Sequence, residues 1–72
     1  MKDYIYRMMD ERKDLSEKQC KLMAFRNSNF RTLDDTERYL MQRQTGLMDE
    51  YIQILDARIS HAILKEQKED EK

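Results

Sequence analysis

Apolar residues recur at seven-residue intervals in both halves of this chain, and this repeat constrains the fold more than any other feature. In the first half the series is Met8, Leu15 and Leu22. In the second half the two neighbouring series are Leu40, Leu47 and Ile54, and Met41, Met48 and Leu55. Seven residues are about two turns of an α-helix, so each half is predicted to be a helix with an apolar side. Proline and valine are absent and no alternating run occurs, so no strand is predicted.

The connector between the two repeats is predicted from residues that favour helix ends. Asn27, Ser28 and Asn29 form hydrogen bonds to their own backbone and so compete with helix. Asn also tolerates the left-handed conformation that commonly ends a helix, so it can replace a glycine there. Asp34 followed by Glu37 has the spacing of a capping box, which begins a helix.

These signals predict an all-α fold, in which an antiparallel two-helix hairpin assembles into a homo-oligomeric helical bundle similar to a coiled coil. The predicted segments are a hairpin domain over 1–64, with helix one at about 3–26, a turn at about 27–34 and helix two at about 35–64, and a polar disordered tail over 65–72.

The apolar side of the second helix is wider than one helical partner needs. It covers about half of the circumference, from an edge at Leu47 and Ile54 to an edge at Ile52, Ile59 and Ile63. One partner covers little more than about 100°. A chain of 72 residues is also marginal alone, and its single cysteine, Cys20, excludes an intrachain disulfide. We therefore predict a homo-oligomer with Ile52 and Ile59 in its interface; the alternative is a two-helix domain that tolerates exposed apolar residues.

Charge is nearly balanced overall but is unevenly distributed. Residues 1–31 carry eight Lys and Arg against five Asp and Glu, whereas residues 32–72 carry six against ten. The slightly basic first half suits a small phosphorylated ligand and not duplex nucleic acid, which requires a strongly basic face. No run approaches the roughly 20 apolar residues that span a membrane, so no membrane partner is predicted. The free cysteine and the absence of a signal-peptide pattern predict a cytoplasmic setting.

Polar residues interrupt the apolar sides at the same interval. The two series are Arg12, Gln19 and Arg26, and Gln44, Tyr51 and Arg58. In an antiparallel pair we expect Gln19 to meet Gln44 and Arg12 to meet Tyr51. Arg58 is expected beside Tyr4 and Ile5. Such residues either fix the register of the helices or hold a ligand, because Arg suits phosphate and Tyr stacks on bases. The structural role is favoured for the first two pairs, and ligand binding for Arg58. For Arg26 and Arg31, beside the turn, the two roles are equally favoured.

The candidate ligand-binding residues are cations, aromatics and one amide near the two ends of the hairpin. They are Tyr4, Arg7, Arg26, Asn29, Phe30, Arg31 and Arg58. No catalytic residue, cofactor or metal site is predicted. The sequence has no nucleophile and base at useful spacing, no glycine-rich phosphate loop and only one histidine, His61.

One pattern of spacing resembles a known family. Its residues are Leu22, Phe25, Phe30, Leu33, Asp34, Glu37, Leu40, Gln44, Met48, Tyr51, Ile54, Leu55, Arg58 and Ile59. Over about residues 15–63 the chain resembles very small phage-encoded helical hairpins grouped with the anti-CBASS and anti-Thoeris signal sponges. The resemblance implies a phage protein in the bacterial host cytosol that forms an oligomer. It also implies binding of a cyclic nucleotide immune signal without cleavage. The candidate site residues rest on side-chain chemistry and not on this resemblance.

Three classes of function therefore remain at the level of sequence. A cyclic nucleotide sponge leads, and a structural or protein-inhibiting interaction module without a small-molecule ligand is the alternative. A small transcriptional regulator is disfavoured by the near-neutral charge and by the absence of a recognition-helix pattern.

Overall fold

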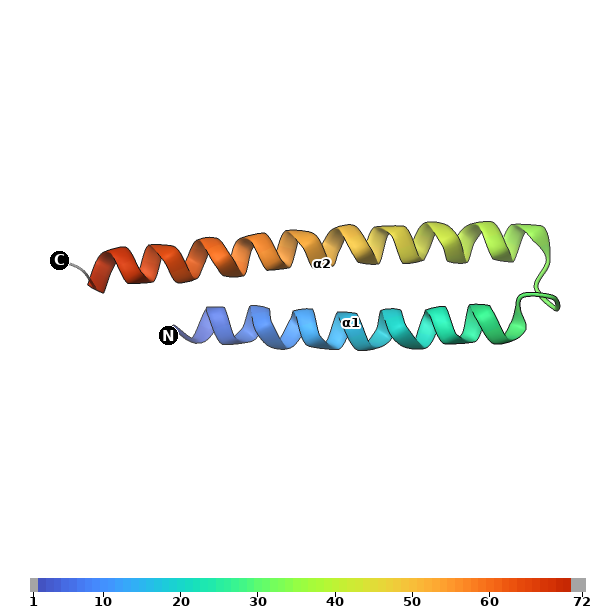
Figure 1. Cartoon of the computed structure of the whole chain (residues 1–72), viewed down its shortest axis with the longest axis horizontal. Helices are drawn as coiled ribbons and strands as arrows, with labels where there is room; N and C mark the ends of the chain where they lie inside the picture. The colour runs from blue at the N-terminus through green and yellow to red at the C-terminus, as the bar shows by residue number, and fades with distance from the viewer. Residues whose placement is uncertain (1, 71–72) are drawn as a thin grey trace.

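The protein is a hairpin of two long antiparallel helices. In the computed structural model, which describes residues 2–70 and the side chains of 2–68, α1 covers Asp3–Asn29 and α2 covers Asp35–Asp70. Both chain ends lie at one end of the hairpin and the turn lies at the other, and the molecule measures 59 × 15 × 13 Å (Figure 1). No strand occurs in the described residues, so the predicted all-α hairpin is confirmed.

The two helices meet along one seam whose residues are separated alternately by three and four positions. On α1 the buried and half-buried seam positions are Ile5, Met8, Arg12, Leu15, Gln19, Leu22, Arg26 and Asn29. On α2 they are Arg38, Met41, Thr45, Met48, Ile52, Leu55, Ile59, Ala62 and Glu66. This is the heptad spacing of a coiled coil, which keeps one side of each helix against the other. The packing is densest near the chain ends, where Ile5, Met8 and Ala62 form a buried cluster with Met9, Ile59 and Ile63 against it.

The turn closes around the main chain of Asn29. The Asn29 carbonyl accepts hydrogen bonds from the N–H groups of Thr32 and Leu33, at 3.0 and 3.2 Å, and from the Thr32 hydroxyl at 2.8 Å. No described residue has a positive φ, so the prediction of a left-handed Asn was wrong. Instead, Asn29 Nδ2 donates to the carbonyl of Phe25 at 2.9 Å, which satisfies one of the exposed carbonyls at the helix end.

The start of α2 follows the predicted cap. The Asp34 carboxylate accepts a hydrogen bond of 2.7 Å from the N–H of Glu37. This bond satisfies one of the N–H groups that the first turn of a helix leaves without a partner.

The helices are longer than the sequence patterns indicate. α1 extends three residues beyond position 26, and α2 continues to Asp70 through a segment predicted to be a disordered tail. Residues 71–72 of that segment lie outside the described residues. Lys, Glu and Gln dominate the segment, and all three are good helix formers, so a helix that is already nucleated continues through them.

The register differs from the expected one, and this changes which apolar residues remain uncovered. Arg12 lies beside Asp56 and not beside Tyr51. Gln19 is half-buried in the seam, whereas Gln44, its expected partner, is exposed. Ile52 and Ile59, which we expected in an oligomer interface, belong to the seam within one hairpin. The exposed edge of α2 is instead the line of Leu40, Leu47 and Ile54. No helix in the described part of the chain has the length and apolar character that crossing a membrane requires.

The seam predicts a large difference between two leucines of α2. Leu55 is fully buried, whereas Leu64 is 58% exposed and lies outside the seam. Leu55→Ala should lower the free energy of unfolding by about 2–5 kcal/mol, because it removes packed methyl groups and leaves a cavity. Leu64→Ala is the matched control and should change it by no more than about 0.5 kcal/mol. Urea unfolding followed by circular dichroism measures both; equal losses would contradict the assignment of the seam.

Candidate functional site

Two adjoining pockets lie on one side of the helix–helix seam, toward the chain ends. The central pocket, of about 460 Å³, is lined by Arg7, Asp10, Glu11, Asp14, Leu15, Lys18 and Tyr51. The terminal pocket, of about 190 Å³, is lined by Tyr4, Met8, Arg58, His61, Ala62 and Lys65. They share a side of the hairpin because Tyr4, Glu11 and Lys18 recur every seven residues on α1. Tyr51, Arg58 and Lys65 do the same on α2.

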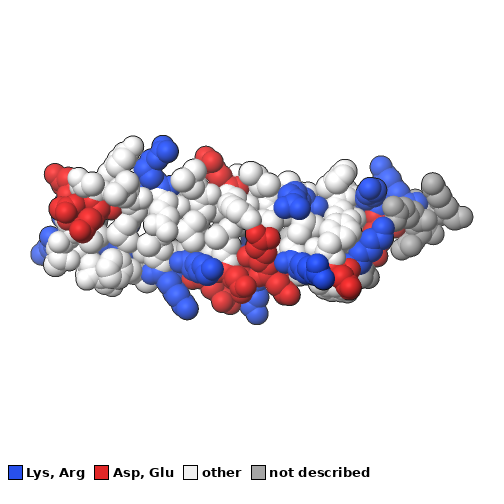
Figure 2. Space-filling model, turned by 180° about the vertical axis from the view of Figure 1, so that it is seen from behind, with Lys and Arg blue, Asp and Glu red and all other residues white. Residues whose placement is uncertain are grey.

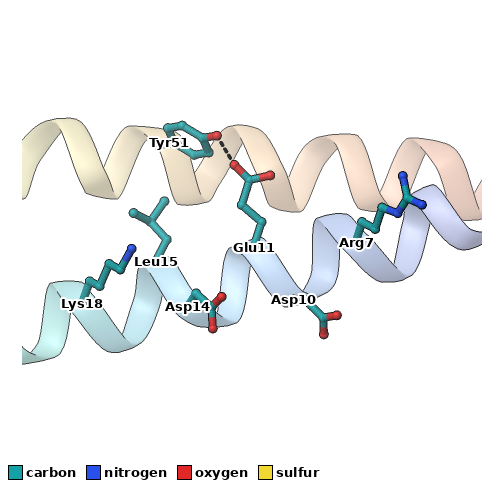
Figure 3. Close-up of a pocket in the computed structure, with 7 residues that line it drawn as sticks. All are labelled: Arg7, Asp10, Glu11, Asp14, Leu15, Lys18 and Tyr51. Atoms are coloured by element: carbon teal, nitrogen blue, oxygen red, sulfur yellow. Dashed lines mark hydrogen bonds between the residues drawn. The ribbon is translucent and has the colours of Figure 1, made fainter.

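A hydrogen bond between the helices divides the central pocket. The Tyr51 hydroxyl of α2 donates to the Glu11 carboxylate of α1. Figure 3 shows this bond in the middle of the pocket, with Arg7 and Lys18 toward its two ends and with Asp10 and Asp14 pointing away from α2. The centre of this pocket is therefore acidic, and its cations stand apart.

The Tyr51 phenol is held in its neutral form. The hydrogen bond to Glu11 raises the pKa of Tyr51 above its usual value of 10.0, and the negative charge of Glu11 acts in the same direction. The positive charge of Arg58 opposes this shift. Tyr51 and Arg58 are thus neighbours along α2, and they connect the central pocket with the terminal pocket.

The terminal pocket is the more suitable of the two for an anion. Arg58, Lys65 and His61 supply its polar groups, and no acidic side chain among the described residues lines it. Met8 and Ala62 are buried beneath it, and the ring of Tyr4 is half-exposed at its edge. Cations beside an aromatic ring and an apolar floor suit a phosphorylated ring compound, because phosphate binds the cations and a base stacks on the ring.

The turn residues do not join this site. Asn29 is bonded to its own helix, and the Phe30 ring is covered by the guanidinium of Arg38, which lies 4.4 Å from the ring centre. Arg38 also donates to the Phe30 carbonyl at 2.8 Å, so this pair holds the turn to α2. Arg26 is half-buried and Arg31 is exposed. Within one hairpin, these residues lie at the end opposite the terminal pocket (Figure 1).

Arg12 has a structural partner. Its Nε donates to Asp56 at 2.6 Å, and this bond, with the negative charge of Asp56, raises the pKa of Arg12 above its usual value. The pair ties α1 to α2 on the side of the seam opposite the two pockets. It explains Arg12 in the seam without a ligand.

Of the seven sequence candidates, the structure brings Tyr4 and Arg58 into one pocket and puts Arg7 in the next. Sequence reasoning missed His61 and Lys65 and assigned Tyr51 a structural role. The available signal was the continuation of the Tyr51 and Arg58 line to Lys65 at the same seven-residue interval. No group of three or more His, Cys, Asp or Glu side chains in the described residues has the arrangement of a metal site.

Comparison with known proteins gives one match. A family model described as Sequestin matches residues 2–61, which include both helices, the turn and most residues of the two pockets. No curated protein and no solved structure matches the chain.

The bond between Tyr51 and Glu11 predicts a pH dependence. Because the folded pKa of Tyr51 is raised, the stabilisation from this bond is fully present below pH 10. It is lost as the pH rises through the folded pKa. Glu11→Gln removes the negative charge and should move the pKa of Tyr51 back toward 10.0.

An NMR titration with ring-labelled tyrosine resolves Tyr51 from the other tyrosines. Glu17→Gln is the matched control, because it removes an exposed carboxylate of α1 that is outside the two pockets. The same Tyr51 pKa in the wild type and in Glu11→Gln would show that the bond does not persist in solution.

Proposed function

Because the chain belongs to the Sequestin family, we propose that it binds and sequesters a cyclic nucleotide signal without cleaving it. The family name indicates a sequestering, non-catalytic role. The ligand class, the phage origin and the place of action, the bacterial cytosol, extend that role along the resemblance to anti-CBASS and anti-Thoeris sponges. In this proposal the protein is an anti-defence protein, which lowers the free concentration of an immune signal by mass action.

The terminal pocket carries the proposal. Arg58 and Lys65 suit the phosphates of a cyclic nucleotide, and Tyr4 suits a base. The described residues give Arg58 no hydrogen bond or ion pair, so its guanidinium is available to a ligand. Arg7, which lines the adjoining pocket, is the next cation along the same side.

A second function is favoured by a separate observation. Leu40, Leu47 and Ile54 form an exposed apolar line on α2, and such a line suits a protein partner. An interaction module that inhibits another protein, with no small-molecule ligand, is therefore the alternative. The two functions differ in whether any nucleotide stabilises the protein.

A sequestering protein returns its ligand unchanged. Wild-type protein incubated with cyclic mono-, di- and trinucleotides should retain one of them through gel filtration. At about a hundred times the dissociation constant, that nucleotide should stabilise the fold by about 2.7 kcal/mol. After heat denaturation, chromatography should recover the cyclic nucleotide intact. Linear products absent from a boiled control would identify an enzyme, and no retention or thermal shift with any nucleotide would favour the interaction module.

Arg58→Ala tests the pocket itself. Loss of a charge-assisted phosphate contact costs about 1.5–3 kcal/mol of binding, so the dissociation constant should rise by roughly ten- to a hundredfold. The melting temperature without ligand should change little, because Arg58 is exposed. Lys13→Ala is the matched control, since Lys13 is an exposed cation of α1 that lines neither pocket.

The same titration decides between the two ends of the hairpin. If Arg58→Ala binds as the wild type does and the double variant Arg26→Ala, Arg31→Ala loses binding, the turn residues are the site. Collapse of the unliganded Arg58→Ala protein would make Arg58 a structural residue.

A further inference from the structure

The exposed edge of α2 has the spacing of a second helix-packing seam. Its residues are Leu40, Gln44, Leu47, Tyr51, Ile54, Arg58 and His61, which are separated alternately by four and three positions. Leu40, Leu47 and Ile54 are 57%, 58% and 59% exposed, because the seam with α1 occupies another side of α2. Figure 2 shows one face of the molecule, where uncharged side chains form a band along the hairpin and charged ones gather mainly at its edges. A helix with two such seams is suited to two helical partners, and one hairpin supplies only one.

The hairpin exposes more surface than its mass requires. A compact monomer of 8.9 kDa exposes about 4,800 Å² by the usual scaling with mass. This hairpin exposes 5948 Å². The excess of roughly 1,100 Å² is comparable with the about 800 Å² that each partner buries in a standard protein interface. A second copy of the chain on the exposed edge would cover part of this excess.

The charges beside the edge select one arrangement of two copies. In antiparallel packing about a two-fold axis, Leu40 can lie opposite the partner's Tyr51, and Leu47 opposite the partner's Gln44. The heptad count then puts Arg43 beside the partner's Glu50 and Ile54 opposite the partner's Glu37. A shift of one heptad in one direction puts Arg43 beside the partner's Arg43, and a shift in the other direction puts Glu50 beside the partner's Glu50. Both pairs are repulsive. Parallel packing puts each Arg58 against the other.

This arrangement also bears on the terminal pocket. Its volume of about 190 Å³ is below the roughly 300–1,000 Å³ of typical ligand sites. The antiparallel pair brings the turn end of one copy to the terminal pocket of the other, with the partner's Leu33 opposite Arg58. Phe25, a half-exposed ring at the turn end, continues the α1 line of Tyr4, Glu11 and Lys18. The two candidate regions, far apart in one hairpin, become neighbours in a pair.

We propose that a second copy of the chain packs antiparallel on the Leu40, Leu47 and Ile54 edge and closes the terminal pocket with its turn end. The closure of the pocket rests on the proposed function, whereas the packing of the two copies does not. The tests below read mass and cross-links without any ligand. Their failure is therefore distinguishable from a failure to bind nucleotide.

Light scattering coupled to gel filtration should give the wild type twice the chain mass of 8.9 kDa at micromolar concentration. Leu47→Glu should give a monomer that remains helical, because Leu47 lies outside the α1 seam. Arg43→Glu and Glu50→Arg should each weaken the dimer by at least about tenfold, and the double exchange should restore it, since the two residues meet across the two-fold axis. Lys13→Glu is the charge-matched control and should remain a dimer. A monomeric wild type overturns the proposal, and a double exchange without recovery overturns the register.

A disulfide test measures whether the turn end of one copy lies beside the terminal-pocket end of the other. In a Cys20→Ser background, the double variant Ile54→Cys, Glu37→Cys should form covalent dimers on oxidation. Positions 37 and 54 lie about 26 Å apart along α2, so they cannot bridge within one chain. The matched control Lys13→Cys, Glu37→Cys should remain mostly monomeric on a denaturing gel. Equal cross-linking of the two variants, or none in either, overturns the closure of the pocket by the turn end.

Discussion

The single seam between α1 and α2 determines every other feature of this molecule. Ile5 and Leu55 are its only fully buried large side chains in the described residues, and no second layer of structure supports them. Because the seam uses alternate three- and four-residue steps, it fixes which lines of each helix become neighbours. Tyr4, Glu11 and Lys18 are thereby set against the line of Tyr51, Arg58 and Lys65. The two pockets follow from this register and from no specialised loop.

The seam is also less apolar than a stable coiled coil requires. Arg12, Gln19, Arg26 and Thr45 occupy positions where Leu or Ile gives the strongest packing. Arg12 keeps an ion pair with Asp56 whose side chains remain 41% and 50% exposed, so the pair specifies the register more than it stabilises the fold. The described part of the chain leaves more large apolar side chains exposed than buried. A hairpin of this kind gains stability from whatever covers its exposed edge, which links its folding to its partners.

Sequence alone predicts the helices, the hairpin and the cap at Asp34, because periodicity and capping are local properties. The register is not local. It depends on how many residues the turn consumes, and the closure around the Asn29 carbonyl leaves Arg12 beside Asp56 and not beside Tyr51. A shift of about one helical turn leaves each apolar side facing inward, so periodicity cannot detect it. For the same reason, periodicity predicted the wrong uncovered edge, at Ile52 instead of Leu47, and did not identify His61 and Lys65 as pocket residues. Tyr4 with Arg58 was predictable because both lie near the chain ends, where a small shift still leaves them adjacent.

A small hairpin that sequesters a nucleotide must form a deep site from shallow surfaces. Both pockets are open grooves beside one seam, and the cations that line them come from helices and not from enclosing loops. In the proposed pair, the ligand contacts both copies, so binding and association are linked. Linkage is reciprocal: a ligand that binds the pair more tightly than the single hairpin strengthens the association by the same factor. Two weak equilibria, self-association of a 72-residue chain and binding in a shallow groove, then reinforce each other. In the proposed pair, this coupling would let so short a chain reach the affinity that sequestration requires without a large core of its own.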